Sequence, residues 1–279
     1  MHRKAASLKG MTAIRPYPIA VAQTQLDDLH RRIDMTRWPE PETVEDWSQG
    51  VPLAALQDLV AYWRNQYDWR ACEAWLNGFD HFLTEIDALD IHFIHAPSPH
   101  QGAMPLILTH GWPGSVIEFL DVIGPLCDPV AFGGRAEDAF HVVVPSLPGY
   151  GFSGKPARAG WGVEKVAQSW AELMRRLGYD RWVAQGGDWG AIVTTMLGAQ
   201  APDGLIGIHT NIPLGNPTAE DRKDTSPEVA AALEAGLRYK NEDTGYSKIQ
   251  STRPQTIGYA LVDSPVALAG WIYEKMWRW

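Results

Sequence analysis

The sequence predicts an α/β fold built on a mainly parallel sheet that is covered on both faces. Between residues 82 and 213, short apolar strands alternate with helical stretches, which is the pattern of such a sheet. Helical patterns alone precede and follow this stretch. We therefore expect three parts: an N-terminal helical extension over residues 1–80, an α/β core over residues 81–217 and a helical cap over residues 218–279.

The composition is that of an ordinary globular protein. Of the 279 residues, 45% are hydrophobic and 20% are charged, and the length suffices to bury a large core. A net charge of −9 argues against nucleic acid or an anionic membrane as a partner. No apolar run approaches the roughly 18 residues that would span a bilayer, so we expect no membrane anchor.

The N-terminus and the cysteines favour a cytoplasmic protein. Residues 1–10 are basic but lack the apolar stretch of a secretory signal, and Met11 could equally be the true start. Cys72 and Cys127 lie far apart in the sequence, which suits a reducing compartment and offers no disulfide framework. We therefore predict a cytoplasmic location.

Two helical stretches form the predicted extension. Apolar residues at helical spacing cover residues 24–37, which begin with a threonine suited to cap a helix and end before Pro39. A second stretch covers residues 53–76. We expect these helices to form a collar or lid outside the sheet.

The predicted core begins with a hairpin and continues with buried strands. Alternating residues over 82–86 and 91–95 predict two antiparallel strands with a turn near residues 87–90. Continuous apolar runs predict the other strands, which cover residues 105–109, 141–145, 181–185 and 205–209. The predicted core helices cover residues 116–126, 164–177 and 191–200. After residue 213 we expect only helices, over residues 227–240, 246–250, 256–261 and 265–277.

A sharp turn between a predicted strand and a predicted helix carries the candidate nucleophile. Residues 186–191 read GGDWGA, in which small residues let the central side chain adopt a strained conformation at the edge of the sheet. The adjacent helix N-terminus favours negative charge. The central residue is Asp188, a carboxylate that can attack a strained or activated carbon and form an ester. The alternative is a glycine-rich turn in which Asp188 only caps the following helix.

A second motif supplies candidate hydrogen-bond donors. Residues 110–115 read HGWPGS, follow the strand over residues 105–109 and open a helix. Hydrolysis of an ester needs donors aimed at the carbonyl oxygen of the tetrahedral intermediate. We predict that the backbone N–H groups of Trp112 and Trp189 form this oxyanion hole. The alternative is a tight loop at a helix start, with His110 hydrogen-bonded into the fold.

These motifs, together with PSLPGYGFSG at residues 145–154 and a long block at residues 245–275, resemble the microsomal-type epoxide hydrolase family of the α/β-hydrolase superfamily. The similarity includes the N-terminal helical extension. It implies an α/β-hydrolase fold in which Asp188 attacks an epoxide carbon, and water then hydrolyses the hydroxyalkyl ester to a vicinal diol. It also implies that two cap tyrosines donate hydrogen bonds to the epoxide oxygen, and the GYxxIQSTRP match places the first of them at Tyr246.

The resemblance further implies parts that follow the cap in the family: a second tyrosine, the last strands of the sheet, a carboxylate and a histidine base. One histidine follows Asp188, and this residue, His209, ends a predicted strand, where a packed or hydrogen-bonded role is favoured. We therefore expect a core sheet without its final strands, and a chain that is alkylated at Asp188 but turns over poorly. We also expect poor solubility or homo-oligomers, because an open sheet edge exposes unpaired backbone groups.

Two alternatives stay open. A haloalkane dehalogenase also has Asp followed by Trp in this turn but needs no phenolic acid, and Tyr246 within the matching block argues against it. The chain could instead be a non-catalytic relic of a truncated gene. The predicted reactants are a small apolar epoxide and water, with no cofactor. We also predict no metal ion, because no H-x-x-x-H or C-x-x-C spacing is present.

Overall fold

The computed structural model describes residues 13–213, 215, 217–224 and 226–279. The predicted leader, residues 1–10, and Met11 lie outside the described residues. Contacts divide the described chain into two units. The first unit comprises residues 13–20 and 70–213, and the second comprises residues 21–69 and the described residues from 215 to 279.

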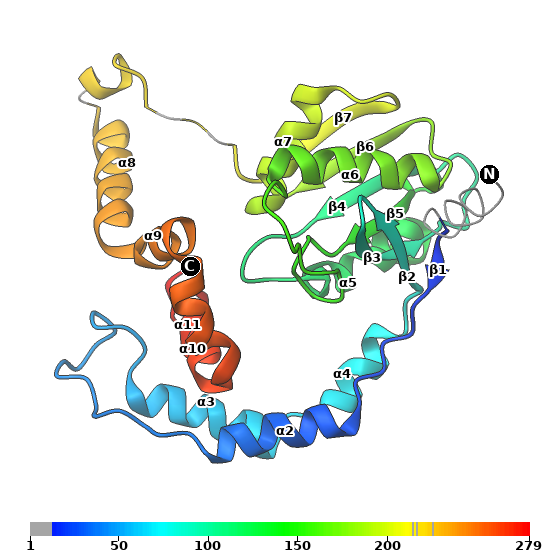
Figure 1. Cartoon of the computed structure of the whole chain (residues 1–279). Coiled ribbons are helices and arrows are strands. Elements are labelled where there is room, and N and C mark those ends of the chain that lie inside the picture. Colours follow the sequence, from blue (N-terminus) through cyan, green and yellow to red (C-terminus); the bar gives the residue numbers. More distant parts are fainter. Residues whose placement is uncertain (1–12, 214, 216, 225) are drawn as a thin grey trace. The chain divides into compact units, whose positions relative to one another are not determined.

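The first unit is built on a mixed sheet of seven strands in the described chain (Figure 1). The strand order is β1-β2-β3-β5-β4-β6-β7. The strands are β1 (Arg15–Pro16), β2 (His81–Ile86), β3 (Leu89–Ala96), β4 (Met104–Thr109), β5 (Phe140–Pro145), β6 (Trp182–Gly186) and β7 (Leu205–Thr210). This confirms the predicted hairpin and the four predicted strands that follow it. The short strand β1 is absent from the prediction, because two residues carry no periodic pattern.

The direction of the strands differs between the two halves of the sheet. β5, β4, β6 and β7 pair in parallel, whereas β1, β2 and β3 join the sheet through antiparallel pairs. The sheet is therefore parallel only in the half that carries residues 104–210, and not mainly parallel throughout. The predicted turn between β2 and β3 contains Asp87 and Ala88, both with positive φ.

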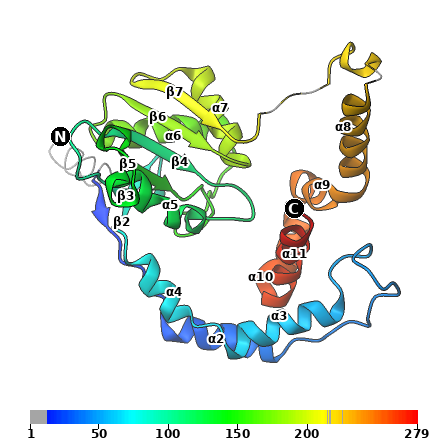
Figure 2. The same ribbon diagram turned by 180° about the vertical axis from the view of Figure 1, so that it is seen from behind.

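Helices cover both faces of this sheet, as expected. Figures 1 and 2 show α6 and α7 on one face and α5 on the other. The helices of the first unit and its boundary are α4 (Trp69–Leu76), α5 (Leu120–Cys127), α6 (Val163–Arg176) and α7 (Trp189–Gln200). Short 3₁₀ turns are η1 (Val116–Phe119), η2 (Pro129–Phe132) and η3 (Ala136–Asp138).

The main core of the first unit lies between the sheet and α6. Trp170, Leu173 and Met174 recur at helical spacing and are fully buried, whereas Glu164 and Arg176 stand at the ends of α6 where the helix dipole favours their charges. The indole N–H of Trp170 donates a hydrogen bond to Oγ1 of Thr109 at 3.0 Å. This contact ties the core to the end of β4, where the candidate site begins.

The second unit is helical. Its elements are α2 (Gln23–Asp34), α3 (Leu53–Asn65), η4 (Asp221–Lys223), α8 (Pro227–Arg238), the π-helical turn η5 (Tyr239–Asp243), α9 (Gly245–Thr252), α10 (Pro254–Asp263) and α11 (Pro265–Arg278). Ile33, Val60 and Val266 form a buried cluster that joins α2, α3 and α11. Residues 21–69 therefore pack with helices that follow them by about 200 residues in the sequence.

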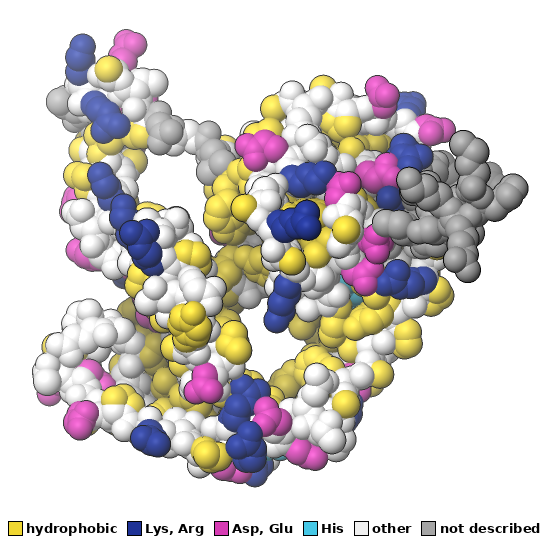
Figure 3. Space-filling model, viewed as in Figure 1, with side chains coloured by type: hydrophobic (Ala, Val, Ile, Leu, Met, Phe, Trp, Pro, Cys, Tyr) yellow, Lys and Arg dark blue, Asp and Glu magenta, His cyan; other side chains and the backbone are white. Residues whose placement is uncertain are grey.

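One predicted helix is broken in the structure, and apolar side chains of the later helices are exposed. The helix predicted over residues 53–76 breaks at residues 66–68 into α3 and α4, because polar residues such as Asn65 and Asp68 compete for backbone hydrogen bonds. Apolar side chains are exposed along the later helices, among them Leu237, Tyr259 and Val262. Figure 3 shows hydrophobic side chains at the surface of the helical part of the chain. In the part of the chain that the structure describes, no helix has the length and apolar character needed to cross a membrane.

Candidate active site

The turn between β6 and α7 holds Asp188 at the carboxyl edge of the parallel strands. β6 ends at Gly186 and α7 begins at Trp189. Asp188 has φ 51° and ψ −126°, a backbone conformation that costs roughly 1–3 kcal/mol for a residue with a Cβ. The flanking residues must be small, because a Cβ at Gly186 would clash with the carbonyl of Gly190, and one at Gly190 with that of Thr109. The GGDWG sequence therefore folds into the strained turn that its pattern predicts.

The loop that follows β4 lies against this turn. The backbone N–H of Trp112 donates a hydrogen bond to Oδ1 of Asp188 at 2.8 Å. Gly111 allows this approach, because a Cβ at that position would clash with the carboxylate of Asp188. The structure thus brings together two predicted site residues that are 76 positions apart in the sequence. An N–H group that reaches this carboxylate also suits the oxyanion of an ester formed on it.

Trp189 is the first residue of α7, next to Asp188. At this position an N–H group has no partner inside its own helix, which is the property that an oxyanion donor needs. Trp189 as a whole residue is 48% exposed. Its role as the second donor stays a prediction.

His110 is buried and hydrogen-bonded at both ring nitrogens. Its Nε2 accepts a hydrogen bond from the N–H of Leu147 at 3.0 Å, so the proton is on Nδ1, which lies 3.1 Å from the carbonyl oxygen of Gly111. Burial lowers the pKa of His110, and the Gly111 carbonyl and Asp188 oppose this effect. The arrangement matches the alternative in which His110 is hydrogen-bonded into the fold.

Sequence reasoning misses two ionisable groups that interact electrostatically with Asp188. Partial burial, and then Asp188, raise the pKa of Glu118, whose carboxylate lies against the α-carbon of Gly114. Burial, and then Asp188, raise the pKa of Tyr150 to about 12. The centres of the Tyr150 and His110 rings are 5.4 Å apart, and the two rings meet edge-on. Both positions were within reach of a motif search, since Glu118 follows HGWPGS and Tyr150 lies inside PSLPGYGFSG.

Tyr246 belongs to the second unit, where it lies in the first turn of α9. The centre of its half-buried ring is 5.0 Å from Nζ of Lys275 and 5.5 Å from the centre of the Trp279 ring. Asp188 belongs to the first unit. The pairing of Tyr246 with Asp188 in one site therefore stays a prediction.

His209 lies inside β7, where its backbone pairs with Gln185 and its side chain is exposed. Asn211 directly follows β7, and its side-chain amide lies so close to Gly187 that a Cβ at position 187 would clash with it.

Across residues 13–213, 215, 217–224 and 226–279, no group of three or more His, Cys, Asp or Glu side chains is arranged to hold a metal ion.

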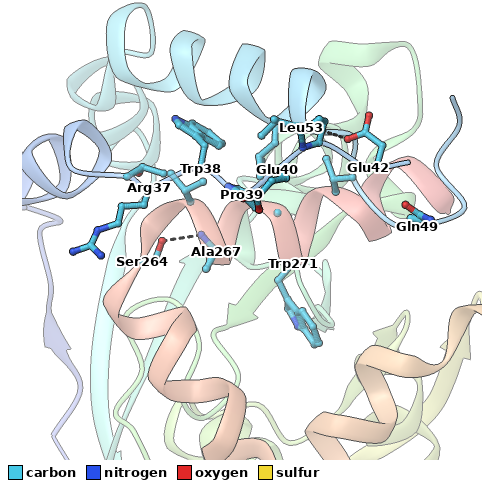
Figure 4. A pocket seen from close by; sticks show the side chains of 16 residues that line it. Arg37, Trp38, Pro39, Glu40, Glu42, Gln49, Leu53, Ser264, Ala267 and Trp271 are labelled. Atoms are coloured by element: carbon cyan, nitrogen blue, oxygen red, sulfur yellow. Dashed lines mark hydrogen bonds between the residues drawn. The ribbon is translucent and has the colours of Figure 1, made fainter. Parts of the chain in front are cut away.

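A groove of about 490 Å³ lies in the second unit, between the segment joining α2 to α3 and the helix α11 (Figure 4). Two of its polar side chains cap helices. Glu42 accepts the N–H of Leu53 at 2.8 Å, and Oγ of Ser264 accepts the N–H of Ala267 at 3.1 Å. The predicted site residues do not line this groove.

Two family signatures match the chain. The signature described as the epoxide hydrolase N terminus matches residues 14–119, and the one described as the alpha/beta hydrolase fold matches residues 104–237. A protein of Stigmatella aurantiaca assigned to the epoxide hydrolases is 59% identical over 266 residues, which is 95% of this chain and 60% of the relative. The chain spans about three fifths of the length of the curated relatives it matches.

Solved structures agree with these matches. The structure of Aspergillus niger epoxide hydrolase is similar with a TM-score of 0.84 at 33% identity, covering 95% of this chain and 70% of that one. Juvenile hormone epoxide hydrolase from the silkworm Bombyx mori is similar with a TM-score of 0.85 at 34% identity, covering 95% and 66%. The chain therefore has the α/β-hydrolase fold that the resemblance implies.

Proposed function

We propose, from the premise that the chain belongs to the epoxide hydrolase family, that Asp188 opens an epoxide by nucleophilic attack. A carboxylate oxygen of Asp188 forms a bond to one ring carbon, and the bond between that carbon and the epoxide oxygen breaks. The phenol of Tyr246 gives its proton to the epoxide oxygen, which leaves a hydroxyalkyl ester on Asp188. Water then attacks the ester carbonyl; one of its protons goes to the departing alkoxide and the other returns to the phenolate of Tyr246, which releases a vicinal diol and restores the carboxylate and the phenol.

The hydrogen bond from Trp112 to Asp188 carries this proposal. In the ester, the oxygen of Asp188 that is not alkylated becomes the carbonyl oxygen, and it takes up negative charge when water attacks. A backbone N–H already 2.8 Å from an Asp188 oxygen requires little reorganisation to stabilise that charge. Trp189, at the start of α7, supplies the second donor.

The proposed substrate is a small apolar epoxide, and the proposed reaction needs no cofactor. Trp189, which is next to Asp188 and about half exposed, supplies apolar surface that suits such a substrate. For the 279-residue chain itself, we propose that the ester forms faster than it is hydrolysed. The reason is that His209, the histidine that follows Asp188, lies inside a strand and not on a loop facing the nucleophile.

The test is the mass of the purified chain after exposure to styrene oxide. We expect an adduct of one substrate, located by peptide mapping on residues 182–200. The isosteric Asp188→Asn variant provides the control and should form no adduct there. An adduct of equal size on Asp188→Asn would show that another residue is the nucleophile.

A second assay separates the epoxide reaction from halide displacement. The chain is incubated in parallel with styrene oxide and with 1-bromobutane, and the mass of the protein adduct, the diol and the free bromide are measured. An adduct with the epoxide and no bromide release supports the proposal, whereas bromide release without reaction of the epoxide would favour a haloalkane dehalogenase. A steady rate of diol formation equal to that of a full-length relative would contradict slow hydrolysis of the ester.

Tyr246→Phe tests the proton donor. General-acid catalysis contributes about 10²–10⁴-fold, so we expect ester formation to slow by about 100-fold. An unchanged rate would remove Tyr246 from the mechanism while leaving the role of Asp188 intact.

A further inference from the structure

We propose that Lys275 is a positioning residue for Tyr246. The ammonium group of Lys275 lies over the phenol ring of Tyr246 and stabilises the negative charge that develops as the phenol gives up its proton. Because Tyr246 acts as a proton donor only under the function proposed above, the catalytic part of this role rests on that proposal. The electrostatic part does not, and it can be measured without any substrate.

Lys275 is a buried cation. It lies on α11, its side chain is 3% exposed, and its Nζ is 5.0 Å from the centre of the Tyr246 ring on α9. Nζ also lies 2.8 Å from Oε1 of Glu274 and 3.3 Å from the carbonyl oxygen of Asp243. The ammonium is therefore held between two oxygen atoms and one aromatic ring.

Burial of an ammonium group is unfavourable unless its surroundings replace the lost water. An apolar side chain such as methionine would fill a similar volume without that cost. The face of an aromatic ring attracts a cation, and the attraction is stronger where water is excluded. The ring of Tyr246 is thus a partner that a buried Lys275 uses, and an uncharged residue would leave this interaction unmade.

The surrounding groups hold this pair in place. Arg278 donates two hydrogen bonds to the carboxylate of Asp243, at 2.8 and 2.9 Å, while the carbonyl of the same residue accepts from Lys275. Arg278, more than any other group, holds the pKa of Asp243 below its usual range. The ring of Trp279 meets the Tyr246 ring edge-on. Lys275, in the last turn of α11, and Trp279, directly after it, therefore contact the phenol ring of Tyr246.

The charged groups around Lys275 and Arg278 lie on several elements. On α11 they include Glu274, and on η5 they are Glu242 and Asp243, with Glu242 lying 4.0 Å from Arg278. Arg238, at the end of α8, also acts on Asp243. Arg278 is paired with Asp243, and Lys275, which is paired with Glu274, is the cation placed over the ring. A phenolate attracts this ammonium more strongly than a neutral phenol does, so Lys275 favours the proton-releasing state.

The experiment is the titration of Tyr246 in the 279-residue chain, followed by NMR of isotope-labelled tyrosine and assigned through the signal lost in Tyr246→Phe. In Lys275→Met we expect the ionisation constant of Tyr246 to fall about tenfold, which a change of one pKa unit represents. Lys275→Arg keeps the charge and should restore most of the effect. The matched control is Lys248→Met, which removes the same charge from an exposed side chain of α9 and should leave the titration nearly unchanged.

The inference is overturned if Lys275→Met leaves the titration of Tyr246 where it was, or if Lys248→Met shifts it equally. Ester formation on Asp188 supplies the kinetic part of the test. Lys275→Met should slow it about tenfold, and should slow it no further in a Tyr246→Phe background. Equal slowing in both backgrounds would show that Lys275 acts only on the structure. If the unchanged chain forms no ester at all, the proposed function fails, and the titration still decides whether Lys275 acts on Tyr246.

Discussion

The backbone N–H of Trp112 donates a hydrogen bond to Oδ1 of Asp188 at 2.8 Å. This bond joins the loop after β4 to the turn after β6, two neighbouring parallel strands of the sheet. It places a donor on the carboxylate before any substrate is present. The predictions below concern the residues that make this geometry, and the buried groups around it.

Gly111→Ala should disrupt the hydrogen bond between Trp112 and Asp188. The added Cβ would clash with the Asp188 carboxylate, so the loop or the side chain must move. Displacement of a reacting group by about 1 Å can lower a rate roughly 100-fold, and we expect a loss of this size in ester formation with styrene oxide. Gly207→Ala is the matched control, because its Cβ would make only ordinary contact with Val183 on the same sheet. Equal rates in Gly111→Ala and Gly207→Ala would contradict the role of this loop.

Asp188→Gly should be more stable than Asp188→Ala. Both variants lose the carboxylate, but only alanine keeps a Cβ in the strained conformation at φ 51° and ψ −126°. Relief of this strain should raise the free energy of unfolding of Asp188→Gly by about 1–3 kcal/mol over Asp188→Ala, although glycine loses some of this gain through its more flexible unfolded state. Urea unfolding followed by tryptophan fluorescence provides the measurement. Lower stability of the glycine variant would show that the turn is not strained.

Stability should fall in acid because two buried histidines must stay neutral. His81 donates from Nε2 to the carbonyl of Leu76 at 2.7 Å, so its Nδ1 accepts from Nε2 of His92 at 2.9 Å, and Nδ1 of His92 accepts from the hydroxyl of Ser146 at 2.9 Å. Burial lowers the pKa of His92 from 6.5 to about 3, with the charge of His81 adding to the effect. Burial also lowers the pKa of His81, and the hydrogen bond to the Leu76 carbonyl and then the charge of Asp80 oppose this effect.

The sign follows from the depressed pKa in the folded state. Between pH 6.5 and about 3 the unfolded chain binds a proton at His92 that the folded chain does not. The free energy of unfolding should therefore drop as pH falls through this window, by up to about 1.4 kcal/mol per pH unit for this residue. His92→Gln can keep one donor and one acceptor. Its free energy of unfolding, measured with urea between pH 7 and pH 5 (about two pH units), should fall less steeply with falling pH. A slope as steep as that of the unchanged chain would exclude His92 as its cause.

Glu118→Gln should stabilise the protein at neutral pH and not in acid. The pKa of Glu118 is raised by burial and then by Asp188, so the folded state disfavours its charge at pH values above its usual 4.5. Glutamine has the same shape and no charge, and it removes this cost. The stability gain, measured by thermal unfolding, should disappear as the pH falls below the pKa of an ordinary glutamate. A gain of equal size in acid would show that Glu118 acts through packing alone.

Most of the fold could be predicted because its signals are local. The buried strands read as short apolar runs, and α6 reads as apolar residues at helical spacing between an acidic first turn and a basic last turn. The break between α3 and α4 and the two-residue strand β1 were missed, since neither leaves a pattern longer than a few residues. The antiparallel pairing of β3 with β5 was missed for another reason: strand order depends on contacts between distant segments.

The candidate site divides in the same way. The sequence alone determines that Asp188 lies in a strained turn between a strand and a helix, because glycine spacing decides which backbone conformations are sterically allowed. Only the tertiary structure shows that the N–H of Trp112 reaches Asp188 and that Lys275 lies over Tyr246. It also shows that burial, and then the charge of Asp188, raise the pKa of Glu118 and that of Tyr150. These contacts depend on how separate elements pack, and packing is decided by the burial of the whole core and not by the residues beside each contact.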